Sequence, residues 1–162
     1  MKINLRVIAL MLVLMNLSCN DNSKKHTTSK DSETKTEFKN THVNEHCFLY
    51  AKNNDTIQLV LKEYKTTATG YLLFNFYQKD GSHGSFEGVM KGDTLFADYN
   101  FEAEGTKSKR EIIFLKKGQT LLQGYGELEV DAHNRTVFKK DATITFDDKF
   151  PLTAVACDTL DL

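Results

Sequence analysis

Tryptophan is missing from the sequence, and its 162 residues include only one proline and three cysteines. Basic residues are not in excess, because 21 Lys plus Arg face 22 Asp plus Glu. This balance predicts no basic surface for nucleic acid. The mean hydropathy of -0.42 excludes a protein with several membrane spans. The 40% of hydrophobic residues are enough for one core, and the length suits about one domain.

The sequence also has little that indicates catalysis. It contains no glycine-rich phosphate loop, no serine in a nucleophile motif and, apart from His42, His46 and Cys47, no cluster with metal-ligand spacing. The histidines after residue 45, His46, His83 and His133, are far apart in sequence and lie near predicted strand starts and loops. The sequence therefore favours a protein that is not an enzyme, and no cofactor is expected.

The N-terminus has the pattern of an export signal. Lys2 and Arg6 precede nine consecutive apolar residues, 7–15. This run is too short to span a bilayer core of about 30 Å, but it is typical of the central part of a signal peptide. We therefore assign residues 1–18 to a signal peptide.

The end of this signal, Asn16-Leu17-Ser18-Cys19, resembles the lipobox of bacterial lipoproteins. The resemblance implies that Cys19 is acylated and becomes the first residue of a mature, membrane-anchored envelope protein. Asn16 stands where the motif usually has an aliphatic residue, which leaves an ordinary secretory cleavage nearby as the alternative. Asn20 follows the cysteine in place of aspartate, which favours the outer over the inner membrane.

The stretch after Cys19 is too polar to form a core. Residues 20–44 contain only two strongly apolar side chains, Phe38 and Val43. Such a segment is expected to be a flexible tether with a root-mean-square span of roughly 25 to 30 Å. The chain thus divides into a signal peptide (1–18), a lipidated cysteine with its linker (19–44) and a folded domain (45–162).

Within the folded domain, apolar residues recur at every second position, which is the period of a β-strand. Residues 94–102 show the pattern most clearly, and residues 57–62 and 142–146 repeat it. Turn-forming residues separate these strands: Asn53-Asn54-Asp55, Asp80-Gly81-Ser82, Lys91-Gly92-Asp93, Lys117-Gly118-Gln119, residues 131–134 and Asp147-Asp148.

About eight to ten short strands with no room for crossover helices predict consecutive antiparallel pairing. A sheet of this length usually curls or closes, which removes its exposed edges. We therefore predict an all-β fold, a single up-and-down antiparallel β-barrel. A small barrel has an interior just wide enough for side chains or one small ligand.

This architecture resembles the calycin and lipocalin-like barrels of small bacterial lipoproteins across nearly all of residues 45–157, without the Gly-x-Trp signature of true lipocalins. Three segments and Tyr99 resemble a narrower group of small envelope lipoproteins: Gly92-Asp93-Thr94-Leu95, Arg110-Glu111-Ile112 and Gly124-Tyr125-Gly126-Glu127. The resemblance implies a barrel in the cell envelope and implies no activity.

Cys47 and Cys157 lie near the two ends of the folded domain, and an exported chain matures where disulfides persist. We predict that they form a disulfide, which would stabilise the fold by about 4 kcal/mol in the chain-entropy model. The alternative is a copper or zinc site built from His42, His46 and Cys47. A disulfide at Cys47 would exclude that site.

Arg110 is the most informative charged residue of the folded domain. The mature chain has only one other arginine, Arg135, in a predicted loop. If Ile112 and Phe114 face the barrel interior, Arg110 shares their face. A buried guanidinium requires a carboxylate partner.

Glu127 and Glu102 are the predicted partners of Arg110, with Tyr99 and Tyr125 nearby in the meander of strands. A salt bridge that closes one end of the barrel is one interpretation, and a solvated surface pair is another. In the third, Arg110 anchors an anionic ligand. Arg110, Tyr99, Tyr125 and Glu127 are therefore the candidate ligand-binding residues.

Two classes of function follow. In the first, the barrel binds a small or hydrophobic ligand without catalysis. In the second, it is a structural or interaction module that contacts another envelope protein through its exterior or rim. An interior filled by aromatic side chains favours the second class, whereas an apolar cavity with one or two polar groups favours the first.

Overall fold

The computed structural model describes residues 43–162, which form an all-β domain of eleven strands and one short 3₁₀ helix. The signal peptide, Cys19 and His42 lie outside the described residues, so their assignments stay predictions. Within residues 43–162, no helix is long and apolar enough to cross a membrane.

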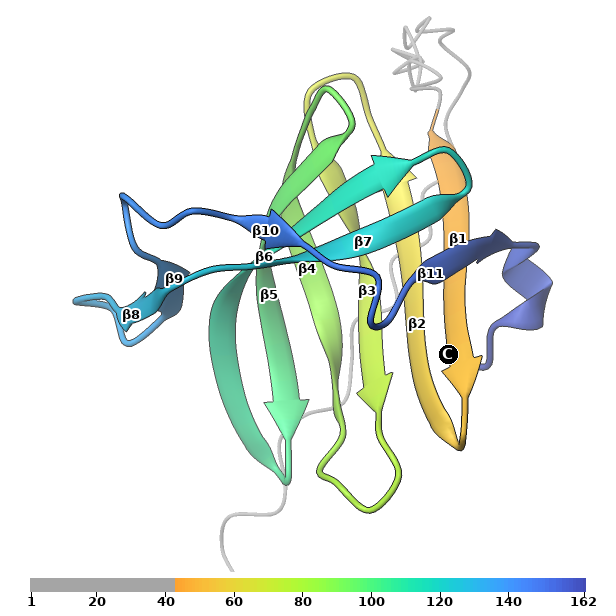
Figure 1. The fold of residues 1–162 in the computed structure, drawn as a ribbon, viewed down its shortest axis with the longest axis horizontal. Helices are drawn as coiled ribbons and strands as arrows, with labels where there is room; N and C mark the ends of the chain where they lie inside the picture. The colour runs from red at the N-terminus through yellow and green to blue at the C-terminus, as the bar shows by residue number, and fades with distance from the viewer. Residues whose placement is uncertain (1–42) are drawn as a thin grey trace, which may run out of the picture. The chain divides into compact units, whose positions relative to one another are not determined.

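Figure 1 shows the strands in chain order. They are β1 (Asn44–Lys52), β2 (Asp55–Glu63), β3 (Ala68–Asn75), β4 (Ser82–Lys91), β5 (Thr94–Ala103), β6 (Thr106–Lys117), β7 (Thr120–Tyr125), β8 (Leu128–Val130), β9 (Thr136–Phe138), β10 (Thr145–Phe146) and β11 (Leu152–Val155). The 3₁₀ helix η1 (Cys157–Thr159) follows β11.

Eight of these strands form a closed antiparallel barrel. Strands β1 to β7 pair consecutively, and β11 closes the ring by pairing with β7 on one side and with β1 on the other. The predicted all-β fold and the predicted antiparallel barrel are confirmed. The closing strand β11 lies near the C-terminus, and residues 126–151 separate it from β7. The sequence pattern did not predict this intervening segment.

The hairpin between β1 and β2 shows why the strands follow one another so closely. Asn53 and Asn54 have φ angles of 54° and 67°. A two-residue hairpin in which both central residues have positive φ matches the right-handed twist of the flanking strands, and asparagine tolerates this region better than most residues. The predicted turn at this position is therefore confirmed.

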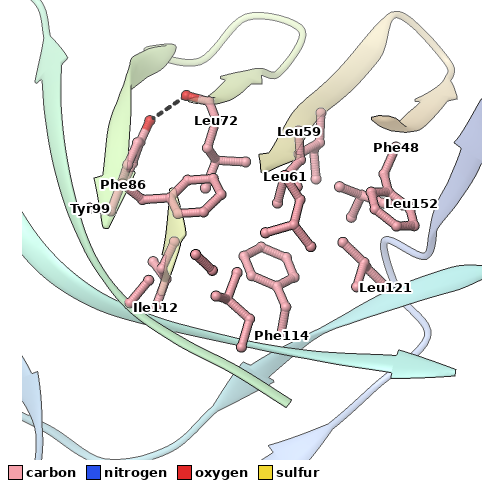
Figure 2. Packing of buried hydrophobic residues seen from close by; sticks show 14 of the residues in the cluster. Phe48, Leu59, Leu61, Leu72, Phe86, Tyr99, Ile112, Phe114, Leu121 and Leu152 are labelled. Carbon is pink, nitrogen blue, oxygen red and sulfur yellow. Dashed lines mark hydrogen bonds between the residues drawn. The ribbon is translucent and has the colours of Figure 1, made fainter. Parts of the chain in front are cut away.

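The core is built from the residues that alternate along the predicted strands. Ile57, Leu59 and Leu61 of β2 are all fully buried, and Leu95 and Tyr99 of β5 are too. Figure 2 shows how side chains from opposite walls of the barrel meet. Burying one such large apolar side chain contributes about 1.5 to 3 kcal/mol relative to its exposure.

After β7 the chain leaves the barrel wall. Residues 127–144, which we call the arm, carry β8 and β9 to one side of the barrel (Figure 1). Strand β8 pairs only with β9, and β9 joins β6 through a single parallel pair, Arg110 with Thr136. This parallel contact departs from the predicted consecutive antiparallel order.

The strand predicted at residues 142–146 is mostly wrong, because only its last two residues form β10. Ile144 instead packs on the outer wall of the barrel. A Cβ atom at Gly124 would lie 3.0 Å from Ile144, and one at Gly126 would lie 2.8 Å from it. The alternating apolar residues therefore pack against the side-chain-free positions Gly124 and Gly126 and do not form a long strand.

The predicted disulfide between Cys47 of β1 and Cys157 of η1 is present, with Cα atoms 5.1 Å apart. It fastens the segment that follows the closing strand to the first strand. Because Cys47 is oxidised, it offers no thiolate for the alternative metal site. In the part of the chain that the structure describes, no group of three His, Cys, Asp or Glu side chains is placed to hold a metal ion.

Candidate ligand-binding site

One end of the barrel is lined by aromatic side chains. Strands β1, β3 and β5 run in the same direction, so all three finish at this end. Tyr50, Phe74 and Phe101 lie within two residues of those strand ends. We call this the aromatic end.

The barrel wall at the aromatic end is incomplete in its backbone pairing. Residues 50–52 of β1 pair with β2 but not with β11, and residues 106–109 of β6 pair with β5 but not with β7. Side chains, several of them half-buried, close the barrel between these two stretches. They include Tyr50, Phe76, Phe101 and Phe150, which pack against the core.

Arg110 points into this aromatic end. Ile112 and Phe114 are buried in the core, as predicted, and Arg110 shares their face of β6. Its guanidinium carbon lies 5.4 Å from the ring centroid of Phe74, 5.7 Å from that of Tyr99 and 5.6 Å from that of Phe101. These three rings, which we call the cage, hold a cation by attraction to their π faces.

No carboxylate neutralises the charge of Arg110. Among residues 43–162, no Asp or Glu side chain lies within ion-pair distance of it, and its Nε atom is buried without a hydrogen-bond partner. Burial lowers the pKa of Arg110 from its ordinary value, an effect that Tyr99 and Tyr125 oppose. The cage therefore contains a charge whose electrostatic partner the described chain does not supply.

The predicted carboxylate partners lie elsewhere. Glu127 pairs with Lys139 at 2.8 Å, and its side chain is 75% exposed because the chain enters the arm after Gly126. Glu102 lies opposite Lys107 in the β5–β6 pairing, one position along from the inward-facing Phe101. Neither carboxylate pairs with Arg110. The predicted salt bridge that closes one end of the barrel is therefore wrong.

Tyr99 is part of the fold as well as of the cage. It is fully buried, and its hydroxyl donates a hydrogen bond of 2.9 Å over strand β4 to the carbonyl of Leu72 in β3 (Figure 2). Burial raises the pKa of Tyr99, whereas Ser82 and Arg110 lower it. The Tyr99 hydroxyl is thus already hydrogen-bonded within the core, and Tyr99 contacts Arg110 through its ring.

Tyr125, at the end of β7, has a more available hydroxyl. That hydroxyl donates a long hydrogen bond of 3.4 Å to Oε1 of Gln123. Burial raises the pKa of Tyr125, Asp147 raises it further, and Arg110 lowers it. Tyr99 thus lies against Arg110, Tyr125 is near enough for each group to shift the pKa of the other, and Glu127 does not join them.

The aromatic end also contains Phe150, which sequence reasoning missed. Its ring centroid lies 5.3 Å from that of Tyr50 and 5.3 Å from that of Phe76. Phe150 follows the polar residues Asp147, Asp148 and Lys149 and precedes the single proline. A lone aromatic residue in such a loop was the only available signal.

The other end of the barrel is closed by charged side chains. Oε1 of Glu63 lies 3.6 Å from Nζ of Lys116 and 3.7 Å from Nε2 of His46. Between this end and the cage the interior is filled by fully buried side chains such as Leu61 and Phe114. Buried side chains thus occupy the middle of the barrel interior, which is not where a ligand would bind.

Comparisons of this chain with protein-family models, with curated proteins and with solved structures found no match. The interpretation of the site rests on its geometry.

Proposed function

We propose that this protein is a lipoprotein anchored in the cell envelope, in the outer membrane, whose barrel binds a small amphipathic anion at the aromatic end without catalysis. The observation that carries the proposal is the guanidinium of Arg110, which lies among three aromatic rings with no carboxylate partner in the described chain. The export signal with Ser18 and Cys19 supports the anchor.

The physical argument starts from the cost of burying a charge. An ion removed from water without a partner loses hydration energy that only a counter-charge or hydrogen bonds restore. A carboxylate placed beside Arg110 would supply both, through charge-assisted hydrogen bonds that are stronger than neutral ones. The surrounding rings would contact the apolar part of the same molecule.

Each residue then has its own role. Arg110 binds the anionic group, and the hydroxyl of Tyr125 is the second donor near it. Phe74 and Phe101 contact the apolar body of the ligand. Tyr99 positions the guanidinium through its ring while its hydroxyl ties β5 to β3.

Calorimetric titration of the full chain in detergent with phenylacetate and with phenylacetamide tests this proposal. The two compounds have the same ring and differ in charge. We expect phenylacetate to bind at least tenfold more tightly than phenylacetamide, and Arg110→Met to remove the difference. Arg135→Met, which removes the other arginine of the mature chain, is the matched control and keeps it. Equal binding of both compounds by the wild-type chain contradicts the proposal.

The membrane anchor has a separate test. Cys19→Ala leaves an unprocessed precursor without an acyl group, which mass spectrometry of the N-terminal peptide detects. Recovery of the wild-type chain as a soluble protein with no acyl mass on Cys19 contradicts the anchor and leaves the ligand site untouched.

The alternative function is an interaction module that contacts another envelope protein through the barrel exterior. The observation in its favour is the arm. Strand β8 pairs along one edge only, and Leu128 and Val130 on it are 49% and 66% exposed. Replacing both side chains with threonine would abolish cross-linking to such a partner in intact cells and leave phenylacetate binding unchanged.

A further inference from the structure

A surface cavity lies next to the cage at the aromatic end. Its volume is about 340 Å³, and its walls include Phe76, Tyr77 and Phe150, with two lysines and one carboxylate beside them, Lys79, Lys149 and Asp55. This volume is within the range of small-molecule sites, which begins at roughly 300 Å³. Arg110 does not line this cavity.

Two phenylalanine rings stand between the cavity and Arg110. Phe150 and Phe76 both line the cavity, and their ring centroids are 5.3 Å apart. On its other side the ring of Phe76 stacks on Phe74 at 6.1 Å, and Phe74 is one of the three rings of the cage. A molecule that enters the cavity therefore meets these rings before it reaches the guanidinium.

Phe150 belongs to a weakly held segment. In residues 145–150, which we call the strap, only Thr145 and Phe146 pair with a neighbouring strand, β7. Asp147, Asp148 and Lys149 form no ion pair within the described chain, and the next strand begins at Leu152. Segments with few backbone hydrogen bonds open locally at a free-energy cost far below that of global unfolding.

We infer that Phe150 is a displaceable plug, and that the ligand is a carboxylate whose single aromatic ring or short acyl group takes the place of the Phe150 ring. The strap swings outward, Phe150 leaves its contacts with Tyr50 and Phe76, and the apolar body of the ligand fills that space. The enlarged cavity is then bounded by Phe76, which stacks on Phe74 of the cage. This inference rests on the proposed function, because it takes the carboxylate to lie at Arg110.

The plug has a measurable consequence for affinity. If the competent state exists only when Phe150 has moved away, the apparent affinity is reduced by the small population of that state. Removing the ring removes this reduction. Phe150→Ala is therefore expected to bind phenylacetate at least fivefold more tightly than wild type, with faster association. Phe96→Ala is the control, because Phe96 is an exposed phenylalanine on the outer wall, and it leaves binding unchanged.

Three outcomes separate the possibilities in titrations of the full chain in detergent with phenylacetate and phenylacetamide. The plug is supported if Phe150→Ala binds phenylacetate more tightly than wild type and Phe96→Ala does not. Unchanged or weaker binding by this variant, while wild type still prefers phenylacetate to phenylacetamide, overturns the plug and leaves the proposed function standing. No preference for phenylacetate in either protein overturns both.

A second variant and a second measurement guard against misfolding. Phe150→Leu keeps most of the apolar volume and is expected to give a smaller gain in affinity than Phe150→Ala. Hydrogen exchange reports the strap without any ligand, and the amide of Phe146 is expected to exchange faster than the amides of β2. Exchange of Phe146 as slow as that of β2 overturns the opening of the strap.

Discussion

Arg110 brings a positive charge into the barrel that no neighbouring side chain of the described residues neutralises. Its contacts with Phe74, Tyr99 and Phe101 are each worth about 0.5 to 1 kcal/mol, more where water is excluded. These gains offset part of the cost of desolvating the guanidinium. We therefore expect the residue to contribute little to folding, and in the proposed function it selects the charge of the ligand.

This balance makes the stability of an Arg110 variant predictable. We expect Arg110→Met to change the free energy of unfolding by no more than about 1 kcal/mol, because no buried carboxylate is left unpaired. Urea unfolding measures it. Combining this change with Glu127→Gln should give additive effects. A loss of about 3 to 5 kcal/mol that the double variant restores would instead show a salt bridge between the two residues.

The inward orientation of Arg110 could be predicted from the sequence, because the two-residue period of β6 places it on the same face as Ile112 and Phe114. Its partner could not be predicted. Glu127 looked close along the chain, but pairing across a sheet depends on where β7 ends, and the chain turns into the arm at that point.

At the scale of elements, the arm is attached to the barrel by charged groups more than by strand pairing. Nη1 of Arg135 donates to both carboxylate oxygens of Asp98 on β5, at 2.9 and 3.0 Å, and its Nε donates to Asp131 at 2.8 Å. The backbone amide of Phe138 donates to Glu111 at 2.9 Å. The backbone amide and side chain of Arg135 lower the pKa of Asp131 to about 2.

The arm should therefore loosen in acid. A carboxylate whose pKa is lower in the folded state stabilises that state fully above its unfolded pKa of about 3.9, and the contribution is lost as pH falls toward 2. We expect the amides of β9 to exchange progressively faster, relative to global unfolding, from about pH 4 to pH 2. Asp131→Asn should remove most of this pH dependence. Protection of β9 that is independent of pH across this range contradicts the role of Asp131.

Strand β5 and the arm show what sequence patterns can and cannot resolve. The alternation from Leu95 to Phe101 predicted a strand that the structure confirms, because both of its neighbours are adjacent in sequence. The alternation around Ile144 looked similar, yet its cause is contact with Gly124 and Gly126 on the outside of the barrel. Periodicity reports burial, and it does not distinguish a strand from a loop packed on one.

At the scale of the whole molecule, the disulfide joins the first strand to the end of the chain across a sequence separation of 110 residues. It holds β11 in place, the strand on which barrel closure depends. In the chain-entropy model such a link stabilises the native state by about 4 to 5 kcal/mol.

Changing Cys47 and Cys157 together to serine is expected to lower the free energy of unfolding by about this amount, measured by urea unfolding under the same conditions as wild type. Reduction of the wild-type protein should have a similar effect. An unchanged unfolding free energy would show that closure by β11 does not need the disulfide.

In the proposed function, the barrel holds a small anionic molecule at Arg110. Native mass spectrometry of the wild-type chain and of Arg110→Met, each extracted gently from its own membrane, tests it most directly. We expect the wild-type chain to carry a bound small molecule with an acidic group and the Arg110→Met chain to be recovered without it. Recovery of both chains with no bound molecule, or with the same one, contradicts binding at Arg110.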